Sequence, residues 1–277
     1  MSAENEQKAI DIPTVIAIST VTWITFNELH TVIGHGSACL LRGYGSQVQA
    51  ISTTLAYCTG KDVPTWGEKL YFAGGHIVNF IAAGIFLLLL RLVRSGSPTI
   101  RLFLWLSLCF NLFNVGNAIL GTTIYGDWAE FVYGLEPSLL WKIVLTLVGI
   151  GIIKLGFFLA SRYWEPFLGG NKTGRLTRMR ILTILPFVTA FVVSVTAGLM
   201  SPLQFEPGIL QSILAPLSLF WLLLLPLWSR NFQTQMSIQA LPIKRSAFWL
   251  AVGVIAVILY IEVQGPGLGD FPEFLLR

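Results

Sequence analysis

Three histidines and two carboxylates have the residue types of a metal site. The histidines are His30, His35 and His76; Glu28 lies two residues before the first of them, and Asp127 follows later in the chain. Imidazole nitrogens and carboxylate oxygens are ligands that zinc takes in catalytic sites, where three protein ligands leave one position open. Water at that position becomes a nucleophile near neutral pH, so this set points to metal-assisted hydrolysis.

Asparagines add amide groups at helical spacing. Asn111, Asn114 and Asn117 recur every three residues, which places them along one stripe of a helix. Asn79 follows His76 by three residues and shares its face. We expect Asn79, Asn114 and Asn117 to orient a substrate backbone or to stabilise an oxyanion. Taken singly, such groups more often hydrogen-bond between helices, so it is the whole set that indicates a site.

The composition excludes most other classes of protein. Of 277 residues, 54% are hydrophobic and 12% are charged, with a mean hydropathy of +0.71, whereas a soluble domain has roughly 25% charged residues. A soluble enzyme, a disordered chain and a fibrous protein are therefore excluded. The basic residues lie between apolar runs, so we expect a lipid bilayer, not nucleic acid, as the surroundings of the chain.

The apolar runs predict an all-α polytopic membrane protein with about seven transmembrane helices, each long enough to span a bilayer. The predicted spans are 13–41, 70–93, 99–122, 139–161, 180–200, 208–228 and 246–263. Residues 43–59 alternate and are rich in β-branched residues, so they predict a short β hairpin after the first helix. The tail after Gln264 is expected to be irregular.

The chain divides into three parts on this basis. Residues 1–12 form a tail, residues 13–130 form a three-helix core that holds every histidine, and residues 131–277 form the C-terminal helices and a short tail. We expect the polar stripes of the first three helices to face one another.

Basic residues between the spans predict the orientation. With the N-terminus in the cytoplasm, 12 of them lie on the cytoplasmic side and 5 on the opposite side. Positive residues favour the cytoplasmic side, so this multi-pass protein is expected to have a cytoplasmic N-terminus.

The three cysteines predict no disulfide framework. Cys39 and Cys109 lie in apolar runs and are expected to be small packing residues. Cys58 lies in a loop and is a candidate reactive thiol.

The order of these motifs resembles that of the site-2-protease-type intramembrane zinc metalloproteases. The stretch from Asn27 to Gly43 is similar to the family's first helix with its H-E-x-x-H motif, and residues 43–59 occupy the place of its hairpin. The stretch from Trp66 to Asn79 is similar to the approach into A-G-P-x-x-N, and Gly126-Asp127-Trp128 stands at the place of its aspartate motif. The resemblance implies peptide-bond cleavage in membrane proteins. It also implies zinc bound by His30, His35 and Asp127, with His76 as an added ligand.

The sequence departs from that pattern at the two histidines. Counting back four residues from His35 gives Thr31, so one register lacks the first histidine; in the other, His30 and His35 are five residues apart. On a regular helix such residues point about 140° apart, and a local π-bulge would bring them together. Either register lacks the usual catalytic glutamate, and Glu28 is the candidate base in its place.

Three other functions compete with that of a protease. An inactive relative would bind or hold other membrane proteins, and the missing glutamate favours it. A transporter would use Lys154, an ionisable residue within a predicted span. A haem protein would use His35 and His76 as axial ligands.

Overall fold

The structure is a computed structural model that describes residues 10–43, 45–60, 64–93, 96–121, 126–169, 172–229 and 240–276. Seven helical segments in it are long and apolar enough to cross a membrane, and they agree with the predicted spans to within several residues at most ends. The prediction of an all-α polytopic membrane protein is confirmed. Most of the predicted tail over residues 1–12 lies outside the described residues.

The first span joins three helices end to end: α2 (Ile12–Glu28), the π-helix η1 (Leu29–His35) and α3 (Gly36–Leu41). Asp11 caps its start, because its carboxylate accepts a hydrogen bond from the Thr14 amide at 3.0 Å. The next spans are α4 (Thr65–Leu92) and α5 (Pro98–Leu120). The short helix α6 (Asp127–Val132) follows and carries the aspartate.

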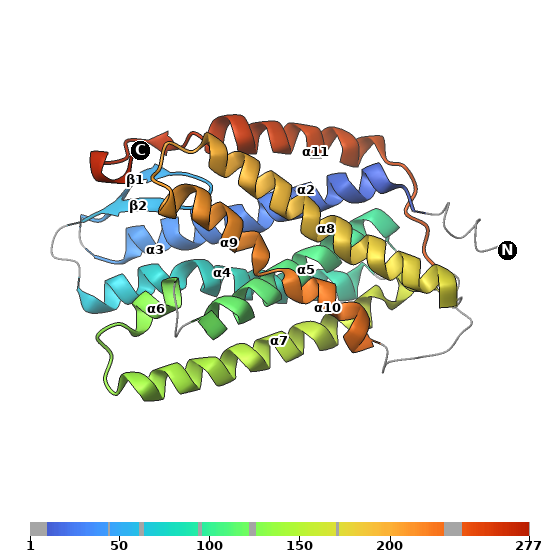
Figure 1. Cartoon of the computed structure of the whole chain (residues 1–277), viewed down its shortest axis with the longest axis horizontal. Coiled ribbons are helices and arrows are strands. Elements are labelled where there is room, and N and C mark those ends of the chain that lie inside the picture. The colour runs from blue at the N-terminus through green and yellow to red at the C-terminus, as the bar shows by residue number, and fades with distance from the viewer. Residues whose placement is uncertain are drawn as a thin grey trace.

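The C-terminal half supplies the remaining spans. They are α7 (Ser138–Leu168), α8 (Lys172–Met200), a broken span of η3 (Glu206–Leu210), α9 (Gln211–Leu217) and α10 (Phe220–Trp228), and finally α11 (Ala247–Leu259) with the π-helix η5 (Tyr260–Gln264). The helices run along one long axis, and α5 lies in the middle of the bundle (Figure 1). Helices α2, α4 and α7 all pack against α5.

The predicted hairpin forms at one end of the bundle. Strands β1 (Gln47–Ile51) and β2 (Ala56–Thr59) pair antiparallel. The tail was expected to be irregular, but Leu268–Gly269 forms β3 on the other edge of β1, and Glu273–Leu275 forms the 3-10 helix η6. The tail reaches β1 because the last span ends beside the hairpin, at the end of the bundle opposite to the start of α2 (Figure 1).

The expectation that Cys39 and Cys58 are unlinked is wrong. Cys39 of α3 and Cys58 of β2 form a disulfide, with their Cα atoms 5.9 Å apart, a separation typical of such bridges. The hairpin folds back over α3 and brings the two together, which spacing along the chain does not reveal. Cys109 is buried and free, as expected of a packing residue.

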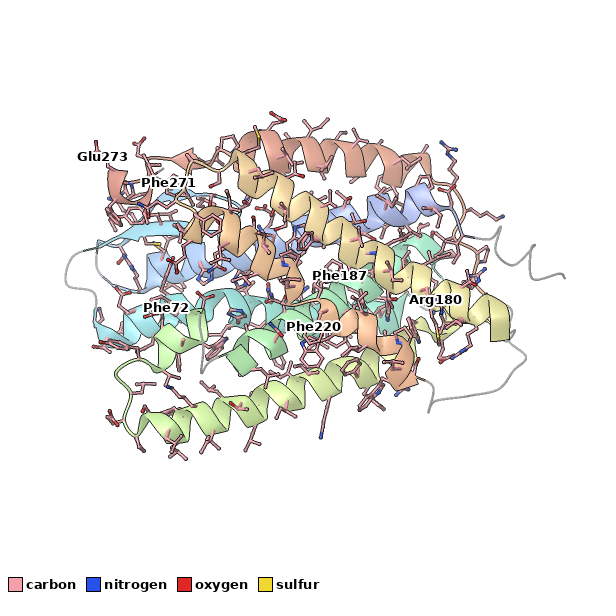
Figure 2. The ribbon with its side chains drawn as sticks, viewed as in Figure 1. Phe72, Arg180, Phe187, Phe220, Phe271 and Glu273 are labelled. Carbon is pink, nitrogen blue, oxygen red and sulfur yellow. A yellow bond between two sulfur atoms is a disulfide. The ribbon has the colours of Figure 1, made fainter. Side chains whose placement is uncertain are left out.

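Side chains fill the spaces between the helices and also project from the outer helices (Figure 2). The core gathers around Trp23, Trp105 and Trp164, all of them fully buried. The outer face of α7 is instead apolar and exposed, with Leu139, Leu140, Ile143, Val144, Leu147 and Ile150 among its residues. Because a soluble protein rarely exposes so large an apolar face, this face is suited to contact lipid.

Candidate metal centre

The first span changes from an α-helix to a π-helix at the two histidines. A π-turn accommodates one more residue than an α-turn, and such turns are frequent at functional sites. His30 and His35 both lie in η1, and their Nε2 atoms are 3.2 Å apart. The structure thus contains the predicted π-bulge and selects the register in which these two histidines form the pair.

Asp127 and His76 complete the cluster from two other helices. One carboxylate oxygen of Asp127 lies 3.4 Å from Nε2 of His35 and 3.9 Å from Nε2 of His30. The same oxygen lies 3.6 Å from Nδ1 of His76, whose ring packs edge-on against that of His30. The bundle therefore brings together all four metal ligands that the sequence predicts.

Hydrogen bonds on the side away from Asp127 orient the imidazole rings of His30 and His35. Nδ1 of His35 donates to the Tyr71 carbonyl at 2.9 Å, and Nε2 of the same ring hydrogen-bonds to the Asp127 carboxylate. The His30 ring donates to the Gly75 carbonyl, and the amide of Asn79 lies 3.3 Å from its Nδ1. Such outer contacts fix the tautomer and raise the basicity of metal-bound histidines. The sequence did not single out Tyr71, because the contact uses its backbone carbonyl.

Gly75 makes room for both rings. A Cβ atom at this position would lie 2.5 Å from Cε1 of His30 and 2.7 Å from Nε2 of His35. On the same side, α4 approaches η1 so closely that a Cβ on Gly34 would lie 2.4 Å from Cα of Gly75. The Gly-Gly-His stretch that ends at His76 was the sequence signal for this close approach.

The geometry of the donors fits a zinc ion. Ligands 2.0–2.1 Å from a tetrahedral zinc lie about 3.3 Å from one another, and the three closest donor pairs here are 3.2–3.6 Å apart. One donor each from His30, His35 and Asp127 lie within 4.8 Å of one another. Nδ1 of His76 is buried with no hydrogen-bond partner among the described residues. A buried polar atom without a partner is costly, and a metal or its ligand would satisfy it.

The environment of Asp127 keeps its carboxyl group ionised. Burial by itself raises the pKa of Asp127, but the neighbouring His35, His76 and His30 outweigh burial and hold the pKa below its usual range. The side chain remains 31% exposed, so the cluster is not sealed on this side. An ionised carboxylate is the form that binds metal.

Glu28 faces a different neighbour. Its carboxyl group hydrogen-bonds to Gln264 of η5, and Gln264 in turn donates to the Ser52 carbonyl of the hairpin at 3.4 Å. This contact directs Glu28 toward the last span and not toward the histidines. Thr31, which takes the place of the family's glutamate, is buried.

Two of the predicted substrate-binding asparagines lie elsewhere. Asn114 donates to Ser218 at 2.9 Å, and Asn117 accepts from Trp221 at 3.1 Å. Both contacts join α5 to the sixth span, so the expectation that this stripe faces the first two helices is wrong for these residues. The reason is that α5 is enclosed by neighbours on all sides and can direct polar groups to any of them. Asn79 alone of the predicted three contacts the cluster.

The two histidines proposed as haem ligands leave no space for a porphyrin. The His30 ring lies against both rings: its centroid is 4.8 Å from that of His35 and 4.6 Å from that of His76.

Lys154, the residue on which a transporter function would depend, is exposed on α7, so it does not line a path through the bundle.

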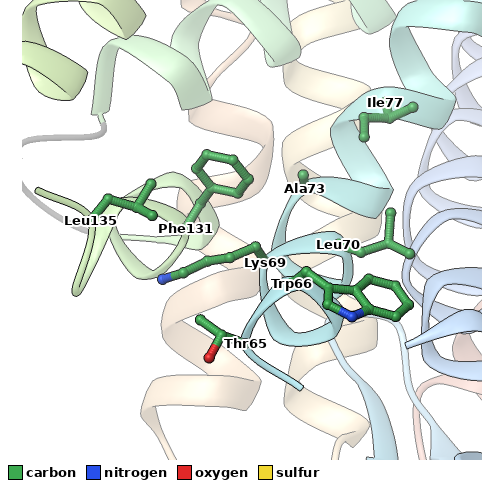
Figure 3. A pocket seen from close by; sticks show the side chains of 8 residues that line it. All are labelled: Thr65, Trp66, Lys69, Leu70, Ala73, Ile77, Phe131 and Leu135. Carbon is green, nitrogen blue, oxygen red and sulfur yellow. The ribbon is translucent and has the colours of Figure 1, made fainter. Parts of the chain in front are cut away.

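An apolar pocket of about 510 Å³ opens beside the cluster, between α4 and α6 (Figure 3). Its lining residues are Thr65, Trp66, Lys69, Leu70, Ala73, Ile77, Phe131 and Leu135. The Lys69 amine donates to the carbonyls of Glu130 and Tyr133, so the one charged side chain among the described lining residues caps the end of α6.

Comparisons of the chain with protein-family models, curated proteins and solved structures find no match.

Proposed function

We propose that this protein binds zinc within its membrane-spanning bundle, through His30, His35 and Asp127, and that it hydrolyses peptide bonds of membrane proteins. The observation that carries the proposal is the convergence of three ligand atoms, from η1 and α6, within 4.8 Å of one another. The order of sequence motifs that resembles intramembrane metalloproteases supports the choice of substrate.

Each residue has a role that follows from its contacts. Nε2 of His30 and of His35 and the Asp127 carboxylate supply three ligand atoms. Zinc held by such a set supplies a nucleophile from water near neutral pH. His76 adds a fourth donor. Asn79 holds the ring of His30 from its far side.

The zinc content of the purified protein tests the metal site. We expect about one zinc per wild-type chain, and less than about a tenth of that in His35→Ala or Asp127→Ala, because each variant loses one of the three donors that lie within 4.8 Å of one another. Glu262→Ala, which removes an exposed carboxylate of the last span, should keep full zinc. A wild-type protein that contains no zinc after zinc-supplemented expression would contradict the proposal.

A second candidate function is that of an inactive relative that binds other membrane proteins. The position of Glu28 favours it, because this carboxyl group is held by Gln264 and no glutamate follows His30. A hydrolysis assay on membrane-protein substrates separates the two functions. Cleavage that Glu28→Gln abolishes would support the enzyme with Glu28 as base, whereas a zinc-loaded protein without cleavage would support the binding role.

We also propose that the N-terminus lies in the cytoplasm. The 12-to-5 distribution of basic residues supports this orientation. Five of these residues, Lys8, Lys61, Arg94, Arg230 and Arg277, lie outside the described residues.

A further inference from the structure

The disulfide and the metal cluster lie at the same end of the bundle. Cys39 follows His35 by four residues, about one helical turn, and is bonded to Cys58 of the hairpin. The side chain of Cys39 is fully buried between α3 and the strands. The hairpin, α3 and α6 gather at the end of the bundle opposite to the start of α2 (Figure 1).

The presence of a disulfide indicates the redox environment of the compartment in which it forms. Disulfides persist in oxidising environments and are rare where cytosolic reductants reach them. The end of the bundle that holds Cys39–Cys58 therefore belongs on the extracytoplasmic side. This argument is independent of the distribution of basic residues.

The charges at the opposite end agree with this assignment. The basic residues there whose side chains are described are Arg91, Arg101, Arg162, Arg175, Arg178, Arg180, Lys244 and Arg245. At the hairpin end the described basic residues are Arg42, Lys69 and Lys142. Two unrelated properties, redox chemistry and charge, thus orient the bundle the same way.

Hydrogen bonds also connect the hairpin to η1, the π-helix that carries His30 and His35. The hydroxyl group of Tyr71 donates to the Ala56 carbonyl of β2 at 2.7 Å, and the backbone carbonyl of Tyr71 accepts from His35 at 2.9 Å. Arg42, just after α3, donates to the Cys58 carbonyl at 3.0 Å. The disulfide thus links α3 to β2, and hydrogen bonds through Tyr71 link β2 to His35. Together these bonds hold His35 in place at the end of the first span.

We infer that the metal centre opens to the extracytoplasmic side and that the Cys39–Cys58 disulfide, formed there, braces the histidine-bearing π-helix. Zinc and substrate would then reach the site from the oxidising compartment and not from the cytosol. The part of this inference that concerns zinc rests on the proposed function. The parts that concern orientation and the disulfide do not.

Labelling of single introduced cysteines tests the orientation. In a Cys109→Ser background, Tyr133→Cys adds a thiol at the exposed end of α6, and Lys244→Cys adds one at an exposed position of the opposite end. A membrane-impermeant maleimide applied to intact cells should label Tyr133→Cys and leave Lys244→Cys unlabelled until the cells are opened. The reverse pattern would overturn the inference.

Alkylation of the denatured protein tests the disulfide, and zinc titration tests the brace. Cys39 and Cys58 should resist alkylation until a reductant is added, whereas Cys109 should react at once. The Cys39→Ala, Cys58→Ala double variant should bind zinc about tenfold more weakly, the lower range for loss of an outer contact, and should melt several degrees lower. Cys109→Ala, the matched control, should change neither.

Each outcome bears on a separate claim. Free thiols at Cys39 and Cys58, or an unchanged zinc affinity in the double variant, would overturn the brace. If the wild-type protein binds no zinc but shows the expected labelling and blocked thiols, the proposed metal site fails and the orientation of the bundle stands.

Discussion

At the level of single residues, the histidine cluster depends on the contacts behind the imidazole rings as much as on the rings themselves. Tyr71 and Asn79 hold the far sides of His35 and His30. Gly75 contributes by having no side chain, because the two rings occupy the space that a Cβ would fill.

Gly75→Ala should abolish zinc binding although it removes no ligand. The added methyl group would lie 2.5 Å from the His30 ring and 2.7 Å from Nε2 of His35, so the rings must separate. Gly84→Ala on the same helix is the control, because a Cβ there would have no atom of the described residues within 4 Å. Isothermal titration with zinc would compare the two, and equal affinities would show that the rings are not where the structure places them.

Asn79→Ala should weaken zinc binding about 10- to 100-fold without preventing folding, which is the usual effect of losing an outer partner of a ligand histidine. The amide nitrogen of Asn79 lies 3.3 Å from Nδ1 of His30. With zinc on Nε2, Nδ1 would carry the proton, and the Asn79 amide would turn its oxygen toward the ring to accept it. Competition with a chelator of known affinity would measure the change. An Asn79→Asp variant, which keeps an acceptor oxygen, should recover most of the affinity.

At the scale of the element, one additional residue in η1 determines the site. The π-helix makes His30 and His35 face each other, whereas a regular α-helix would direct them apart. Ile33 is 51% exposed in the middle of η1, so its removal would sacrifice little packing.

Deletion of Ile33 should therefore preserve zinc binding within about tenfold. The shortened chain would place the histidines four residues apart on a regular α-helix, where they face the same side. Insertion of an alanine after Ile33 should instead abolish binding, because it rotates the following ligand by about 100°. Zinc content of both variants is the measurement, and loss of zinc in the deletion variant would contradict the role given to the π-helix.

At the scale of the whole molecule, the histidine-rich core does not stand apart from the C-terminal helices. α5 packs extensively on α7, and α2 packs on both α8 and α11. The tail adds β3 to the hairpin, and the Gln204 amide donates to the Leu275 carbonyl at 2.8 Å. The boundary between residues 130 and 131 thus marks where the histidine-containing part of the sequence ends. It does not separate two parts that pack independently.

A fragment ending at residue 136 should fail to bind zinc when expressed alone, because α5 and α2 would lose the helices that cover them. Co-expression of the fragment starting at residue 137 should restore zinc binding, since helices inserted separately can associate in the membrane. Co-purification and zinc content are the measurements. Full zinc binding by the first fragment alone would show that the core is self-sufficient.

Local sequence patterns predicted the seven spans, the hairpin and the candidate metal ligands. Spans follow from local hydrophobicity, and metal ligands come from a few residue types, of which histidine is rare in this chain. The register of His30 and His35, the disulfide, the partner of Glu28 and the direction of Asn114 and Asn117 became clear only from the packing of the helices. Each of these depends on which helix faces which after packing, and that choice arises from contacts between segments far apart in the chain.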